Sequence, residues 1–164
     1  MTSTEFAREY WRSTNAHLPE GDANKFATEM LDPRRAEEAL DLVAAKVGFG
    51  LEGRRLLEIG SGVGTVLRVA RERGIDAWGI EPDFLGCRAG RANLREHQVR
   101  QAITCAIGEL LPFADSTFDV VCSFQVLGIN IHLGEPGVFS VKLVAKRRIH
   151  AGVFVLIGLC DINV

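Results

Sequence analysis

The chain of 164 residues lacks several features that would place it in a functional class at once. It has little excess charge of either sign, because the net charge is only −2, so there is no electrostatic basis for nucleic acid as an obligate partner. The longest apolar run, residues 151–160, falls well short of the roughly 20 residues that span a bilayer. The N-terminus has no signal of basic and then apolar residues. We therefore expect a cytoplasmic protein without nucleic-acid or membrane partners.

Cysteine is also sparse and carries no recognisable spacing. The four cysteines, which lack any C-x-x-C pair, are Cys87, Cys105, Cys122 and Cys160. Cys105 and Cys122 lie in apolar runs that resemble strands. This pattern favours buried free thiols in a reducing compartment over a disulfide or a metal site, and we predict no bound metal.

The chain does contain a glycine-rich turn between two elements with clear patterns. Residues 54–59 indicate a short buried strand, residues 60–64 carry three glycines in a G-x-G-x-G pattern, and residues 66–73 indicate a helix that ends before Gly74. Glycines leave room for a ligand to approach the main chain, and the helix N-terminus offers free N–H groups. A strand, turn and helix of this kind form the ligand site of open α/β folds.

Two acids accompany the turn. Glu58 lies two residues before the first glycine, and Glu81 ends a second predicted strand, residues 76–81. Glu81 follows Glu58 by about 20 residues, the offset expected of an acid that binds ribose hydroxyls. A carboxylate suits that role because it accepts two hydrogen bonds from a diol.

The E-x-G-x-G-x-G element with the acid after the second strand resembles the class I S-adenosylmethionine-dependent methyltransferases. The resemblance implies an α/β fold, Rossmann-like and doubly wound, with a mainly parallel sheet, and S-adenosyl-L-methionine as the cofactor. It assigns Glu81 to the ribose, with Pro82 beside it, and Glu58 to the loop and the cofactor's amino group. The loop residues that would shape the methionine pocket are Gly60, Ser61, Gly62 and Gly64.

A second block, residues 107–121, is similar to a signature of small-molecule methyltransferases. The resemblance places Gly108 and Glu109 beside the adenine, and Phe124 and Gln125 beside the transferred methyl group. The chain has Ile107 where the family commonly has an aspartate, and it lacks the Glu-His pair that usually follows residue 127. No catalytic residue is assigned for this reason.

The remaining segments indicate how the chain is organised. Residues 1–31 are expected to form a helical cap segment, in which Tyr10 or Trp11 would cover the cofactor or only pack on the sheet. Asp32 and Pro33 open a helix that Gly48 or Gly50 ends. Residues 32–164 would form the methyltransferase domain, with arginines of helix 66–73 facing outward.

The C-terminal part contains fewer strands than the resemblance implies. Related domains have strand order 3-2-1-4-5-7-6, whereas this chain has material for strands 3-2-1-4-5 only. Strand five, near residues 151–157, would then leave an apolar edge that proteins normally cover. The domain is therefore expected to be incomplete: a truncated or damaged copy, a fragment of a longer protein, or a subunit whose edge is covered by a second copy or a partner.

Three functions remain as hypotheses. The first is methyl transfer to an unidentified, small-molecule acceptor, and the second is a cofactor-binding fragment or pseudoenzyme that acts through a partner. The third, an NAD-dependent oxidoreductase, is disfavoured because the glycine spacing differs from the G-x-G-x-x-G of dinucleotide folds.

Overall fold

The structure is a computed structural model of residues 1–164. It describes residues 1–16, 19, 21–108, 110–114 and 116–124, together with the backbone of residues 153–157. The statements below concern these residues.

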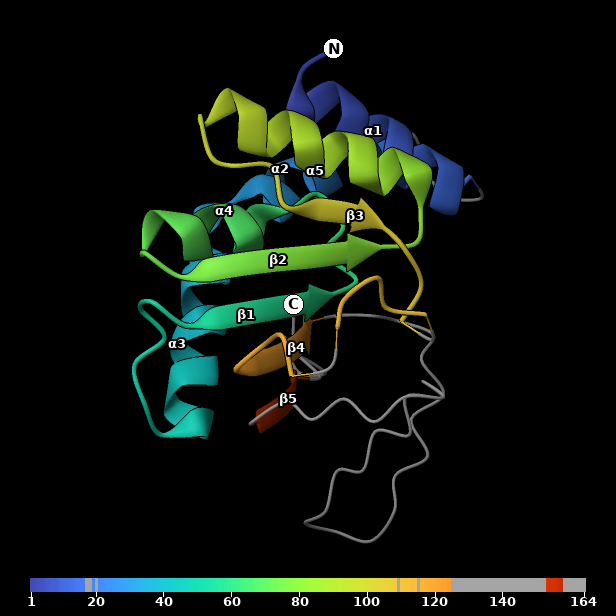
Figure 1. Ribbon diagram of the computed structural model, residues 1–164. Helices are drawn as coiled ribbons and strands as arrows, with labels where there is room; N and C mark the ends of the chain where they lie inside the picture. Colours follow the sequence, from blue (N-terminus) through green and yellow to red (C-terminus); the bar gives the residue numbers. More distant parts are fainter. Residues whose placement is uncertain (17–18, 20, 109, 115, 125–152, 158–164) are drawn as a thin grey trace, which may run out of the picture.

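A parallel sheet of five strands organises the fold, and its order is β3-β2-β1-β4-β5. The strands are β1 (Arg55–Ile59), β2 (Asp76–Glu81), β3 (Ile103–Cys105), β4 (Val120–Phe124) and β5 (Val153–Ile157). This is the strand order that the resemblance to class I methyltransferases implied for the five strands. In Figure 1 the arrows of β1, β2 and β3 point to the same edge, so the loops that leave these strands gather there.

Helix α3 (Pro33–Val47) begins and ends where its sequence indicates. The side chain of Asp32 accepts a hydrogen bond from the N–H of Arg34, and Pro33 occupies the first turn, where its missing N–H costs nothing. Gly48 adopts φ 75°, the left-handed conformation that closes many helices. Its buried side chains, Ala36, Ala39, Leu40 and Val43, pack against the sheet and α4.

Helix α4 (Thr65–Glu72) follows the glycine turn, and α5 (Phe84–Glu96) follows β2. One prediction for α4 is wrong, because Arg68 does not face outward. Only 8% of it is exposed, and its guanidinium lies 3.4 Å from the carboxylate of Glu72. Its aliphatic stem can cover apolar surface while its charge stays paired, which reconciles an arginine with this position.

The two faces of the sheet are covered differently. One face packs beneath α3 and α4 through the alternate residues Leu56, Val120 and Cys122. The other face carries Leu57, Ile59, Ile80 and Val121 and packs against aromatic side chains of the segment between β3 and β4. Phe113 makes edge contacts there with Trp78 and Phe118, at 6.2 and 4.9 Å between ring centroids.

Two N-terminal helices, α1 (Ser3–Thr14) and α2 (Gly21–Leu31), complete the described part of the chain. Helix α1 lies along α5, as Figure 1 shows. The N–H and hydroxyl of Ser3 both donate to the carboxylate of Glu96, at 2.7 Å for the N–H. At the end of α2, the hydroxyl of Thr65 donates to the carbonyl of Met30 at 2.6 Å. Both helices are therefore bound to the elements that flank the glycine turn. Among the described helices, none combines the length and apolarity needed to cross a membrane.

Candidate functional site

The glycine turn makes a tight connection between β1 and α4. Its three glycines, Gly60, Gly62 and Gly64, all have positive φ, at 78°, 47° and 72°. The N–H groups of Gly60 and Ser61 donate to the carbonyl of Ile80, at 2.9 and 3.0 Å, and bind the turn to the end of β2. An added Cβ at Gly62 would meet no described atom within 4 Å. The G-x-G-x-G spacing thus reflects a backbone that only glycine adopts without strain.

Helix α5 crosses this turn at very short range. A Cβ on Gly90 would lie 3.0 Å from the carbonyl oxygen of Gly62, and one on Gly64 would lie 3.2 Å from the Cα of Gly90. Asn93, one turn farther along, donates from Nδ2 to the carbonyl of Val63 at 2.9 Å. The helix therefore supports the turn through main-chain contacts and the hydrogen bond of Asn93.

Glu81 joins the turn to the start of α5. Its side chain is buried, and Oε2 accepts the N–H of Gly62 at 2.8 Å while Oε1 accepts the N–H of Asp83 at 3.0 Å. Burial raises the pKa of Glu81, and its two N–H bonds act in the opposite direction. A carboxylate has about four acceptor positions, so two bonds leave capacity for a diol.

Glu58 is the second buried acid of the site, and its Oε2 does not accept main-chain N–H bonds as the oxygens of Glu81 do. Only 3% of it is exposed, and its Oε2 has no hydrogen-bond partner among the described residues. Burial raises the pKa of Glu58 to about 8, and the charge of Glu81 adds to the rise. The hydroxyl of Ser61 is likewise buried without a partner. Buried polar atoms are normally hydrogen-bonded, so these two suit a polar ligand.

Helix α5 was predicted, but its contribution to the site was missed. Gly86 makes room for Glu81, because a Cβ there would lie 2.9 Å from the glutamate Cγ. Asp83 caps the helix, with Oδ1 accepting the N–H groups of Leu85 and Gly86 at 2.7 and 3.0 Å. Two glycines four residues apart inside a helix, Gly86 and Gly90, were the available signal of a close approach on one face.

Comparison with protein families identifies the family to which the glycine turn and its two acids belong. The model of a methyltransferase domain family matches residues 30–132, which is more than half of the chain and includes the turn and both acids. The chain belongs to this methyltransferase family. The cofactor of the domain is S-adenosyl-L-methionine, and the predicted class I fold is confirmed.

Two curated relatives support the assignment. The chain is 33% identical over 146 residues to an uncharacterized methyltransferase of Mycobacterium sp. (strain KMS), covering 83% of this chain and 54% of the relative. It is 33% identical over 125 residues to a ubiquinone biosynthesis O-methyltransferase of Alkalilimnicola ehrlichii, covering 76% of this chain and 48% of that protein. The methyltransferase chain thus spans about half the length of the curated relatives it matches.

A solved structure from Methanococcus maripaludis, described as a candidate S-adenosylmethionine-dependent methyltransferase, has the same fold. The TM-score is 0.60 at 13% identity, and the similarity covers 93% of this chain and 64% of that one. At this identity the likeness concerns the fold alone.

The remaining predicted site residues of the methyltransferase differ in their surroundings. Pro82 is exposed, and Gly108 is half-buried on the loop after β3. Phe124 ends β4 and packs in the core beneath α3 and α4, with 9% exposed. Glu109 and Gln125 lie outside the described residues.

Three large apolar side chains are exposed at the carboxyl edge, by which we mean the loops after β1, β2 and β3. Phe84, Ile107 and Leu110 are 63%, 51% and 76% exposed, and they follow β2 and β3. Met1 is the other large hydrophobic residue that is exposed within the described part of the chain. A flat apolar group such as a purine would find contact surface here.

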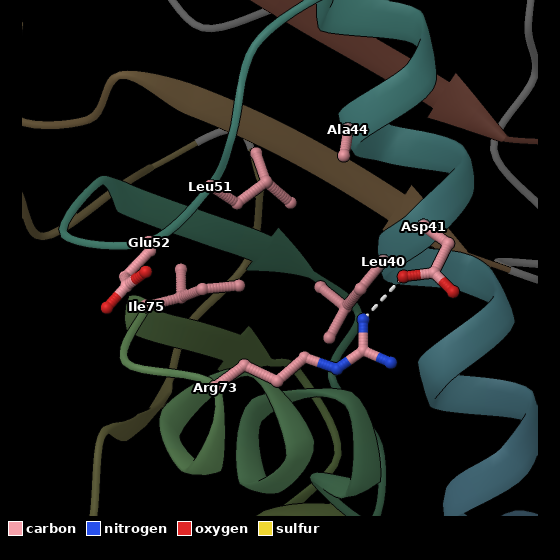
Figure 2. Close-up of a pocket in the computed structure, with 7 residues that line it drawn as sticks. All are labelled: Leu40, Asp41, Ala44, Leu51, Glu52, Arg73 and Ile75. Atoms are coloured by element: carbon pink, nitrogen blue, oxygen red, sulfur yellow. Dashed lines mark hydrogen bonds and ion pairs between the residues drawn. The ribbon is translucent and has the colours of Figure 1, made fainter.

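A shallow pocket of about 190 Å³ lies at the opposite, amino edge of β1 and β2 (Figure 2). It lies between α3, the segment before β1 and the end of α4, and its residues are Leu40, Asp41, Ala44, Leu51, Glu52, Arg73 and Ile75. The guanidinium of Arg73 bonds the carboxylate of Asp41 at 2.6 Å across it. Ligand pockets usually exceed roughly 300 Å³, so we assign no ligand here.

Proposed function

We propose that the domain binds S-adenosyl-L-methionine at the carboxyl edge and transfers its methyl group to a small-molecule acceptor. The observation that carries the proposal is the bond from the N–H of Gly62 to the buried carboxylate of Glu81. This bond joins the glycine turn to Glu81, which supports the proposal that both belong to one site. Glu58, with its unpartnered oxygen, gives the site a second acidic group suited to a cationic ligand.

Each residue of the site has a role that its surroundings support. Glu81 would accept the ribose hydroxyls with the acceptor capacity left by its two N–H bonds. Glu58 and Ser61 would face the methionine end, where their unpartnered oxygens meet an ammonium group and a carboxylate. Ile107 and Gly108 would border the adenine, together with Glu109 as the resemblance implies.

The cofactor, when bound, supplies an already electrophilic methyl group. The protein then needs mainly to hold the acceptor in line with it, and orientation can supply much of the rate acceleration. A small-molecule acceptor is supported by the second sequence block, residues 107–121, and by a relative named for oxygen-directed methylation in ubiquinone biosynthesis.

Residues 1–31 would act as a cap over this site. Tyr10 of α1 lies close enough to Glu81 and Asp83 that their charges, after the larger effect of burial, raise the pKa of its phenol to about 12. Trp11 is 5% exposed and packs on Phe26, so its role is structural. We also propose that the protein is cytoplasmic and that a partner or a second copy covers β5.

Calorimetric titration of the purified chain tests the proposal directly. S-adenosyl-L-methionine is expected to bind with micromolar affinity, whereas NAD is expected not to bind, because the glycine turn lacks the dinucleotide spacing. A folded chain that binds NAD, or that binds neither compound, would contradict the proposal.

A cofactor-binding pseudoenzyme is a second candidate. It is favoured by Ile107, which is exposed at the position where related enzymes commonly have an acid. In that case S-adenosyl-L-methionine would bind, but no screened acceptor would yield S-adenosylhomocysteine. Incubation of the chain with the cofactor and quinol, phenol and amine acceptors separates the two functions.

A further inference from the structure

Two buried carboxyl groups lie near the carboxyl ends of the neighbouring strands β1 and β2. Glu58 and Glu81 are 3% and 4% exposed. In the β1–β2 ladder Glu58 lies opposite Gly79, two residues before Glu81, so the two acids lie on the same face of the sheet. Two negative charges this deeply buried repel each other, so the pair retains a proton in neutral solution.

The hydrogen bonds of the pair decide which acid holds that proton. Glu81 accepts two main-chain N–H groups, at 2.8 and 3.0 Å, and these bonds stabilise its ionised form. Glu58 has an oxygen without a donor among the described residues, and an ionised carboxyl in that situation is costly. The proton therefore belongs to Glu58.

No neighbouring group within the described residues carries a positive charge that would neutralise the carboxylate of Glu81 or an ionised Glu58. Cys122 of β4 lies opposite Glu58, and burial raises its pKa, so it stays a neutral thiol. Tyr10 and Asp83 face Glu81 from α1 and α5. Helices α3 and α4 cover this face mainly with apolar residues such as Leu40 and Leu67, and Arg68 is paired with Glu72. None of the ion pairs found within the described residues involves Glu58 or Glu81.

We propose that Glu58 carries a proton in the cofactor-free protein and releases it to solvent when the ammonium group of S-adenosyl-L-methionine binds beside it. The inference rests on the proposed function. A bound ammonium donates to the unpartnered oxygen and offsets the charge of the second carboxylate, so the ionised form of Glu58 becomes the stable one. Cofactor binding is thereby linked to proton release.

The direction of the pH effect follows from this linkage. Below about pH 8, binding must remove a proton from Glu58, so the affinity for the cofactor rises with pH by up to about tenfold per unit. The amino group of the cofactor itself titrates near pH 7.7–8.0, as α-amino groups do, so the measurement belongs at pH 6.5, where that group is fully charged.

Calorimetry at pH 6.5 in buffers of different ionisation enthalpy counts the released protons. We expect close to one proton per bound S-adenosyl-L-methionine for the wild type and close to none for Glu58→Gln. The matched control is Glu52→Gln, at an exposed carboxyl of the amino edge, which should release the same number as the wild type. Tight binding without proton release would refute the inference and leave the proposed function intact.

Thermal unfolding of the cofactor-free protein provides a second readout. The folded protein binds a proton that the unfolded chain loses near pH 4.5, so the Tm of the wild type should fall between pH 5 and pH 8 relative to Glu58→Gln. Glutamine has the shape of a protonated glutamate, so the variant should fold. If the two Tm curves run parallel, Glu58 holds no proton, whether or not the cofactor binds.

Discussion

The carboxyl and amino edges of β1 and β2 differ in how their polar groups are satisfied. At the amino edge, Arg73 and Asp41 form an exposed ion pair across a shallow pocket. At the carboxyl edge, Glu58 and Ser61 are buried with unpartnered oxygens, beside three glycines with positive φ. A ligand site can contain buried polar atoms that find hydrogen-bond partners only when the ligand binds, whereas exposed polar atoms find them in water. Unpartnered buried oxygens thus accompany the glycine turn at the carboxyl edge, whereas Asp41, which lines the pocket at the amino edge, is paired.

The largest expected effect comes from filling the contact between α5 and the glycine turn. Gly90→Val should destabilise the fold by about 1–3 kcal/mol, because its Cβ would lie 3.0 Å from the main-chain oxygen of Gly62. Denaturant unfolding measures the change. Gly50→Ala, near the amino edge, is the matched control: its Cβ would meet nothing within 4 Å, and its effect should stay within about 0.5 kcal/mol. Equal losses of stability at both positions would mean that the two edges tolerate an added side chain equally well.

Local patterns in the sequence predicted the glycine turn, the Asp32 cap and the end of α3 at Gly48 or Gly50, and the resemblance to class I methyltransferases implied the strand order. They did not predict the support behind the turn. Gly90 and Asn93 serve it through contacts with residues about 30 positions earlier, and no local periodicity reports such contacts. Cys105 was expected to be buried from its apolar run, but it is exposed at the end of β3, a strand at the end of the sheet.

The second prediction concerns cofactor affinity. Glu81→Ala should weaken binding of S-adenosyl-L-methionine by about 1–3 kcal/mol, because the ribose hydroxyls and the N–H of Gly62 would lose their acceptor. Titration calorimetry measures the loss. Asp41→Ala removes an acid from the amino edge, where the ion pair is exposed, and should leave the affinity unchanged. Loss of affinity in both variants would remove the distinction between the edges.

The third prediction tests how α1 is held on α5. Ser3→Ala should cost about 1 kcal/mol of folding stability, because it removes the hydroxyl bond to Glu96. That bond is the largest cause that lowers the pKa of Glu96, so its contribution is present near neutral pH and is lost as the pH falls below about 4. The unfolding curves of wild type and variant should therefore differ at pH 7 and coincide at pH 3.

Thr28→Ala is the control for this experiment. It also removes a hydroxyl hydrogen bond, but one made within α2 to the carbonyl of Asn24, with no carboxylate involved. Its effect should not depend on pH between 3 and 7. A pH-independent effect of Ser3→Ala would show that the bond to Glu96 does not hold α1 in place.

The smallest expected effect on stability concerns Cys105, whose thiol is exposed at the carboxyl edge. Cys105 is exposed and points toward the carbonyl of Pro82, at 3.7 Å, whereas Cys87 and Cys122 are buried. Burial raises the pKa of both buried thiols, so neither should react with a thiol reagent in the folded protein. In a Cys160→Ser background, one thiol should therefore react quickly, and Cys105→Ser should abolish that reaction with a stability change within about 0.5 kcal/mol. Because Pro82 adjoins Glu81, which we propose binds the ribose, S-adenosyl-L-methionine should slow the labelling several-fold. Labelling at an unchanged rate with the cofactor bound would place the cofactor away from the ends of β2 and β3.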